Sequence, residues 1–147
     1  MSQAATAGSP PARFLKLDSA GQSLPQEATE WDAVLDTTTN LTWSVKETRA
    51  IPQPKAPAAA QKLTTCGFDN WRLPTRTELL TLVDDTRYSP AIDTTFFPNC
   101  QSGWYWTSTR AASSPGGCAW VVGFGYGYAG WFGQDLSGFV RAVRVGQ

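Results

Sequence analysis

The chain has 147 residues, the ordinary size of a single domain with its own buried core. Its twelve basic and twelve acidic residues cancel and form no block of one sign, which argues against nucleic acid or an anionic membrane surface as a partner. Histidine is absent, so the usual general base and the commonest zinc ligand are missing. We therefore expect no enzyme, no metal and no cofactor.

Residues 1–12 are small and rich in proline, and they predict a flexible lead-in to one domain over residues 13–147. This lead-in has neither a basic end nor an apolar stretch, so neither a signal peptide nor direct membrane insertion is predicted. The sequence leaves the compartment and the oligomeric state open.

The first predicted elements are strands. Phe14–Leu17 alternates in polarity and predicts a short strand. Ala33–Asp36 and residues 41–45 predict a hairpin, because apolar residues recur at every other position of its second arm.

Two helices are predicted next. Pro57 suits the first turn of a helix over residues 58–63, and Gly67 ends it. Thr75 and Glu78 form a T-x-x-E capping box ahead of an apolar stripe at helical spacing. Just before this box, Arg72 is expected to brace the structure by pairing with Glu78.

The last third of the chain predicts a sheet. Strands are expected over residues 104–108, 119–124 and 139–145, which are rich in β-branched and aromatic residues. With the helices placed before them, the predicted fold class is α+β. Large rings dominate burial energies, so five aromatic residues are assigned to the core: Trp71, Trp104, Trp106, Trp120 and Phe124.

Residues 123–138 combine glycines and aromatics with a single charge, Asp135. Glycine brings no side chain to a core, whereas tyrosine, tryptophan and phenylalanine are stiff side chains that dominate binding hot spots. One interpretation is a ligand-binding region whose main contacts are Tyr126, Tyr128, Trp131 and Phe132. The other is an irregular β-rich end in which the same rings fill the interior.

The three cysteines have no C-x-x-C spacing, so they predict no zinc site and no redox motif. Two alternatives remain for Cys100 and Cys118, a disulfide or free thiols. Three carboxylates beyond the second helix are expected to be structural rather than catalytic or metal-binding: Asp84, Asp85 and Asp93.

The run Asp-Asn-Trp-Arg-Leu-Pro-Thr-Arg-Thr-Glu-Leu-Leu at residues 69–80 is the most specific motif. Together with Tyr-Trp-Thr-Ser-Thr at 105–109 and Phe-Val-Arg-Ala-Val-Arg at 139–144, it resembles the Lcl C-terminal domain family. The resemblance covers most of residues 31–145. It implies a C-type-lectin-like fold, with two helices flanking small twisted antiparallel sheets and a ligand face built from the late strands and loops.

Members of this family act as glycan-binding adhesin tips and as variable proteins of diversity-generating retroelements, which implies a cell-surface or secreted location. In such retroelements, template adenines are miscopied, so that AAC codons become nearly random. Trp131 and Gln134 are not reachable from such a codon. The reachable residues are Gly123, Gly125, Tyr126, Tyr128, Gly130, Phe132, Gly133, Asp135, Leu136 and Ser137.

These reachable residues and Trp131 make up the predicted ligand-binding site. The predicted function is non-catalytic recognition of a protein or glycan ligand on a cell or phage surface, by a hypervariable surface. The alternative is an adhesin domain of fixed sequence that binds glycans. Calcium-dependent sugar binding is doubtful, because the sequence has no Glu-Pro-Asn or Trp-Asn-Asp run to supply the oxygen ligands.

Overall fold

The structure is a computed structural model that describes residues 12–111 and 118–146. The predicted lead-in therefore lies outside the described residues, except for Ala12. Among the described residues, no helix is long and apolar enough to cross a membrane.

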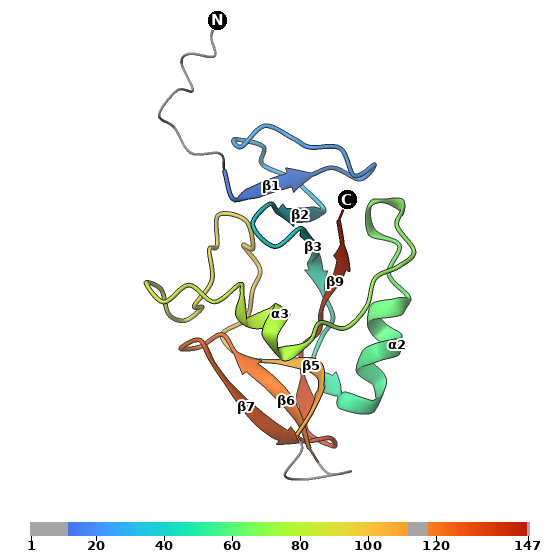
Figure 1. Cartoon of the computed structure of the whole chain (residues 1–147), viewed down its shortest axis with the longest axis vertical. Helices are drawn as coiled ribbons and strands as arrows, with labels where there is room; N and C mark the ends of the chain where they lie inside the picture. The colour runs from blue at the N-terminus through green and yellow to red at the C-terminus, as the bar shows by residue number, and fades with distance from the viewer. Residues whose placement is uncertain (1–11, 112–117, 147) are drawn as a thin grey trace, which may run out of the picture.

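The first sheet joins the beginning of the domain to its end. It contains β1 (Phe14–Leu17), β2 (Ala33–Asp36), β3 (Leu41–Glu47) and β9 (Arg141–Val145), in the order β1-β2-β3-β9 (Figure 1). All its neighbouring strands are antiparallel, and the predicted β2–β3 hairpin is confirmed. The register between β3 and β9 shifts after Trp43, which marks an irregularity in β3.

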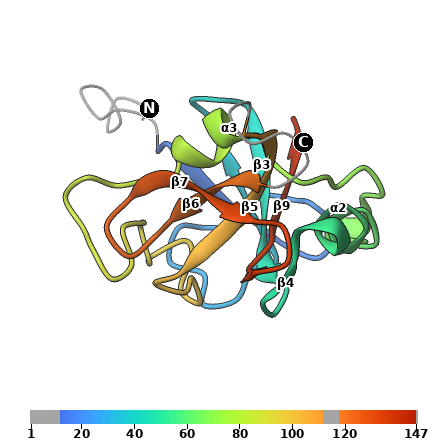
Figure 2. The same ribbon diagram turned by 90° about the horizontal axis from the view of Figure 1, so that it is seen from below.

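The other two sheets form the opposite end of the molecule. One has three antiparallel strands, β5 (Trp104–Arg110), β6 (Cys118–Gly123) and β7 (Tyr128–Gly133), in the order β5-β6-β7. The second pairs β4 (Ile51–Pro52) with β8 (Ser137–Gly138). Figure 2 shows β5, β6 and β7 side by side across the end of the molecule.

The helices are short. They comprise α2 (Ala56–Gln61), α3 (Arg76–Leu80) and two 3₁₀ turns, η1 (Gln53–Lys55) and η2 (Thr65–Gly67). The turn η2 cannot extend α2, because Cys66 and Gly67 have φ angles of 59° and 75°.

The predicted fold class, an α+β C-type-lectin-like arrangement with two helices flanking the sheets, is wrong. Strand makes up 36% and helix 13% of the described residues, so the domain is mostly β, with three small antiparallel sheets. The predicted helices exist, but they have only six and five residues. Pairing between distant segments, such as β3 with β9, decides the architecture more than local helical preference does.

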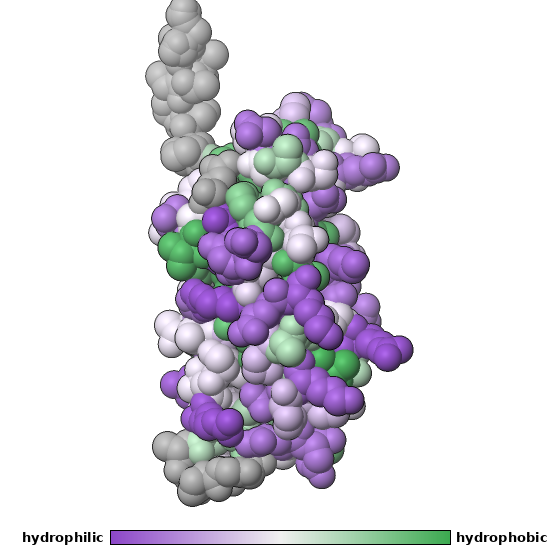
Figure 3. All heavy atoms as spheres, turned by 90° about the vertical axis from the view of Figure 1, so that its right-hand side faces the viewer, coloured by the Kyte–Doolittle hydropathy of each residue, from purple (hydrophilic) through white to green (hydrophobic). Residues whose placement is uncertain are grey.

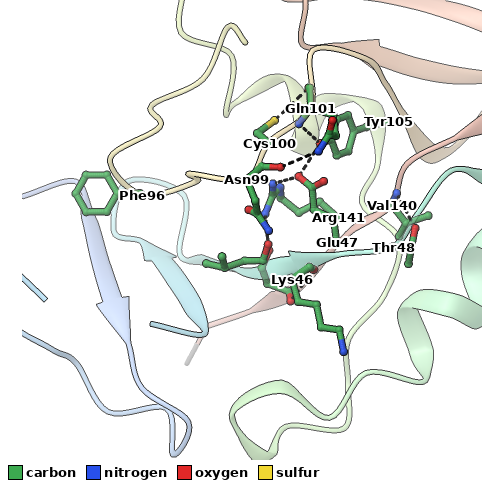
Figure 4. A network of polar contacts seen from close by, with 12 residues as sticks. Lys46, Glu47, Thr48, Phe96, Asn99, Cys100, Gln101, Tyr105, Val140 and Arg141 are labelled. Carbon is green, nitrogen blue, oxygen red and sulfur yellow. Dashed lines mark hydrogen bonds and ion pairs between the residues drawn. The ribbon is translucent and has the colours of Figure 1, made fainter. Parts of the chain in front are cut away.

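A buried polar network connects the first sheet to β5 (Figure 4). Arg141 on β9 donates to the carbonyls of Ser44 and Val45, at 2.8 and 3.0 Å, where the β3–β9 register is irregular. Its other nitrogen donates to Glu47, and Tyr105 on β5 donates its hydroxyl to the same carboxylate at 2.6 Å. The side chains of Arg141 and Glu47 are 1% and 6% exposed, so three strands share one dehydrated ion pair.

The capping box at the start of α3 is confirmed. Glu78 accepts the backbone N–H of Thr75 at 2.9 Å and donates its own backbone N–H to the Thr75 hydroxyl at 3.2 Å. The guanidinium of Arg72 binds both oxygens of Glu78 at 2.8 Å, which confirms the predicted brace. Since Arg72 also pairs with Val143 of β9 through its backbone, this brace fixes α3 against the first sheet.

Replacing Glu78 with glutamine is expected to make the thermal unfolding midpoint depend less on pH in the acid range. The hydrogen bonds from Arg72 hold the pKa of Glu78 below its ordinary value. The ion pair therefore stabilises the fold above about pH 4.3, the ordinary glutamate pKa, and this stabilisation is lost as the pH falls through the lower folded-state pKa. Thermal unfolding midpoints should differ most at neutral pH and converge in acid, whereas a gap that stays constant would contradict this role.

Candidate functional site

The Gly and aromatic stretch forms a hairpin that was only partly predicted. The sequence predicts a strand only as far as residue 124, but Tyr128–Gly133 is a further strand, β7, and pairs with all six residues of β6 without a register shift. The chain reverses through residues 124–127, where Gly127 has a φ of +86° and the position of its Cβ would lie 2.6 Å from Val83. Five of the eleven predicted ligand residues, Tyr128, Gly130, Trp131, Phe132 and Gly133, thus stand on a regular strand.

Strand alternation separates the predicted rings onto two faces, whereas the prediction treated them as one group. Tyr128 and Phe132 project on the face that also carries Trp104 of β5. Their ring centroids lie 5.5 and 4.8 Å from that of Trp104, and the Trp104 ring lies over Gly123 and Gly130. We call Trp104, Tyr128 and Phe132 the Trp104 cluster.

Trp131 lies on the opposite face. It packs edge-on against Trp120 of β6, with ring centroids 5.2 Å apart, and remains 54% exposed. The guanidinium of Arg76, at the start of α3, lies 4.3 Å from the centroid of the Trp120 ring. This arrangement gives the second face a cation and two rings, a combination that suits contact with polar and aromatic groups.

Tyr126 occupies the turn between β6 and β7. It is 75% exposed and stacks on the equally open ring of Tyr88, with centroids 6.3 Å apart and planes 11° from parallel. Next to it, a hollow of about 80 Å³ opens between Tyr126, Tyr128 and Trp104. Its remaining walls are Ser102, Gly103, Gly123 and Gly125, so this hollow offers ring surfaces beside accessible backbone.

The other predicted positions follow β7. Asp135 and Leu136 are exposed in the turn that leads from β7 into β8, and Ser137, also exposed, begins β8. Gly133 ends β7 and accepts the backbone N–H of Leu136 at 3.1 Å, which tightens this turn. Gly123 differs from the rest because it is buried: a Cβ there would lie 2.8 Å from the Trp104 ring. Gly123 therefore supports the Trp104 ring, and it lies in the wall of the hollow without a side chain of its own.

The expected core residues divide in the same way. Trp71, Trp106 and Phe124 are buried as predicted, with exposures of at most 1%. Trp104 and Trp120 are only half-buried. Each packs against a ring of β7 that is itself exposed, Tyr128 and Trp131 respectively. Sequence reasoning missed Tyr88 and Arg76, which lie far from the hairpin in the chain and carry no local signal.

Burial affects two of the three thiols, and hydrogen bonds affect the loop carboxylate Asp84. All three cysteines are free, so Cys100 and Cys118 form no disulfide. Burial raises the pKa of Cys66 to about 11 and also raises the pKa of Cys100, which makes both poor nucleophiles at neutral pH. Asp84 accepts two hydrogen bonds from Thr86. These bonds and the neighbouring Arg87 lower the pKa of Asp84.

The acidic loop borders a second hollow, of about 460 Å³. Its walls include the apolar residues Phe14, Leu82 and Val83, together with Arg13 and the three carboxylates that were predicted to be structural. Arg87 lies 3.0 Å from Asp84 and 3.5 Å from Asp93, so these two carboxylates already have a cationic partner. Within residues 12–111 and 118–146, no three His, Cys, Asp or Glu side chains lie close enough to hold a metal ion.

Comparison with known proteins identifies the class of domain. The profile of the Lcl C-terminal domain family matches residues 32–144, which is well over half of the chain. The chain belongs to this family, and membership indicates a ligand-binding or adhesin-type domain. No curated protein matches the chain.

Two glycines of the hairpin should respond differently to a methyl group. In Gly123→Ala the new Cβ would meet the Trp104 ring at 2.8 Å, whereas in Gly130→Ala its nearest neighbour would be 3.9 Å away. We expect the first variant to lose about 1–3 kcal/mol of unfolding free energy and the second to stay within about 0.5 kcal/mol of the parent. Urea unfolding measures both, and equal losses would show that the Trp104 ring is not packed as described.

Proposed function

We propose that this chain is a non-catalytic recognition domain that binds a protein or glycan ligand through the exposed rings of the β6–β7 hairpin. The observation that carries the proposal is the exposure of three aromatic side chains on one short hairpin. Tyr126, Tyr128 and Trp131 are 75%, 53% and 54% exposed, although each could bury a large apolar area in a contact.

The hairpin supports these rings from beneath. Trp104 and Trp120 each contact an exposed ring edge-on, and the six residues of β7 are all paired with β6. Rings held in this way lose little conformational entropy when a ligand covers them, so more of the contact energy appears as affinity. Figure 3 shows a contrasting region: the side of the molecule that carries α2 is largely hydrophilic, with apolar residues only in small separate groups.

The non-catalytic part of the proposal rests on chemistry. The sequence has no histidine, and burial raises the thiol pKa values of Cys66 and Cys100 away from the range in which thiolates react. The ligand surface contributes rings, glycine backbone and one exposed carboxylate, Asp135, which suits contact rather than bond cleavage.

Within this function, we propose that a diversity-generating retroelement varies the exposed positions of the hairpin. The candidate positions fall into groups, buried, half-buried and exposed, according to what surrounds them. Gly123 and Phe124 are buried supports and cannot vary freely. The exposed positions are Tyr126, Tyr128, Asp135, Leu136 and Ser137. Gly125 and Gly130 are half-buried, but a Cβ added at either would meet its neighbours only at ordinary van der Waals distance.

Sequencing the locus in many isolates tests the proposal of diversification. Substitutions should concentrate at the exposed positions, above all Tyr126 and Tyr128, while Gly123, Phe124 and Gly127 stay constant because each is packed or has a positive φ. A near-copy of the segment with substituted adenines should lie close by. A hairpin that is identical in every isolate, without such a near-copy, would contradict the proposal.

A glycan array tests the alternative of an adhesin with a fixed sequence. Strong binding to one sugar class that is lost in Trp131→Ala but retained in Tyr88→Phe would support that alternative, because only the first change removes an exposed ring. Turnover of a substrate by a variant lacking the rings of Tyr126, Tyr128 and Trp131 would overturn the non-catalytic assignment.

A further inference from the structure

The outer edge of β7 lacks the usual protection of an edge strand. Natural sheets shield their edges with charged residues, prolines or bulges. β7 reads Tyr-Ala-Gly-Trp-Phe-Gly, with no charge and no proline, and its pairing with β6 shows no bulge. Figures 1 and 2 show β7 at the outer side of its sheet, and no described strand pairs with its outer edge.

The backbone groups that face outward follow from the hydrogen bonds of β6. The Cys118 carbonyl accepts the N–H of Ala111, and the Phe124 N–H donates to the Gly103 carbonyl, so even-numbered positions of β6 point toward β5. Odd-numbered positions point toward β7 and bond to their partners there, among them Gly130. The residues between those partners therefore turn their N–H and C=O groups outward, notably Ala129 and Trp131.

We propose that two copies of this chain associate through antiparallel pairing of their β7 edges, about a twofold axis at Gly130. Ala129 of one copy would then pair with Trp131 of the other, and each pair would exchange reciprocal N–H to C=O hydrogen bonds. The two three-stranded sheets would join into one continuous sheet. This inference does not depend on the proposed ligand-binding function.

The side chains of β7 are self-complementary in this register. On one face, Tyr128 of each copy meets Phe132 of the other, an aromatic pair across strands, while two glycines meet at the axis where backbones approach closely. On the other face, the large Trp131 meets the small Ala129. Because β7 has no charge, two copies approach without electrostatic repulsion, and this size pattern points to a second copy rather than to an unrelated peptide.

Charge substitutions at the axis provide the test. Gly130→Glu places two carboxylates opposite each other in a homodimer, and Gly130→Lys places two ammonium groups there. The Cβ of either residue would lie in ordinary van der Waals contact with the Trp104 ring, 3.9 Å away. Like charges across an interface are strongly unfavourable. We expect the full chain to dimerise in sedimentation equilibrium, each variant to weaken dimerisation at least about thirtyfold, and a mixture of the two variants to restore a heterodimer.

Controls separate this result from misfolding or from a different contact. Ser137→Glu adds the same charge at an exposed site outside β7 and should leave the dimer unchanged. Near-ultraviolet circular dichroism and cooperative unfolding report whether the variants remain folded. The proposal is overturned if the folded parent chain stays monomeric up to about 200 µM, if the dimer persists in both charge variants, or if association continues into open-ended polymers.

Discussion

The fold depends on one buried cation, Arg141. Its guanidinium satisfies the carbonyls of Ser44 and Val45, which lie where the β3–β9 register is irregular, and neutralises Glu47 in the same dehydrated space. Burial raises the pKa of Glu47, while the charge of Arg141 and the hydroxyl of Tyr105 oppose that shift. A buried ion pair of this kind adds little stability over an apolar core, but removing either partner is costly, so it fixes one arrangement of the strands.

That arrangement has a direct consequence for the ligand surface. Tyr105 lies on β5 between Trp104 and Trp106, and β5 is also held to the segment before β9 by backbone hydrogen bonds with Phe139. One edge of the three-stranded sheet is therefore anchored to the interior, while β7 at the other edge is open among the described residues. The exposed rings stand on the open side of an anchored sheet, where a ligand or a second copy can reach them.

Local patterns in the sequence predicted what local forces determine. The capping box of Thr75 and Glu78 and the β2–β3 hairpin are set by neighbours in the chain, and both are confirmed. The fold class was wrong because strand pairing over long distances, as between β3 and β9, leaves no local signature. The same limit explains why the sequence predicts no regular strand over the glycine-rich β7 and does not separate its rings onto two faces. The role of Arg141 also escaped prediction, since its partners lie almost a hundred residues earlier in the chain.

Hydrogen–deuterium exchange on a Tyr105→Phe variant tests most directly whether the Arg141 network holds the ligand sheet. This change removes the hydroxyl that donates to Glu47 and accepts the backbone N–H of Gln101, and it leaves the ring packed against Phe124 and Phe139. The account predicts that the amides of β5, β6 and β7 exchange roughly tenfold faster, which corresponds to a free energy of local opening that is lower by about 1.4 kcal/mol. The exchange rates of the amides of β1 and β2 should change little. Unchanged protection of the three strands, or an equal loss throughout both sheets, would contradict it.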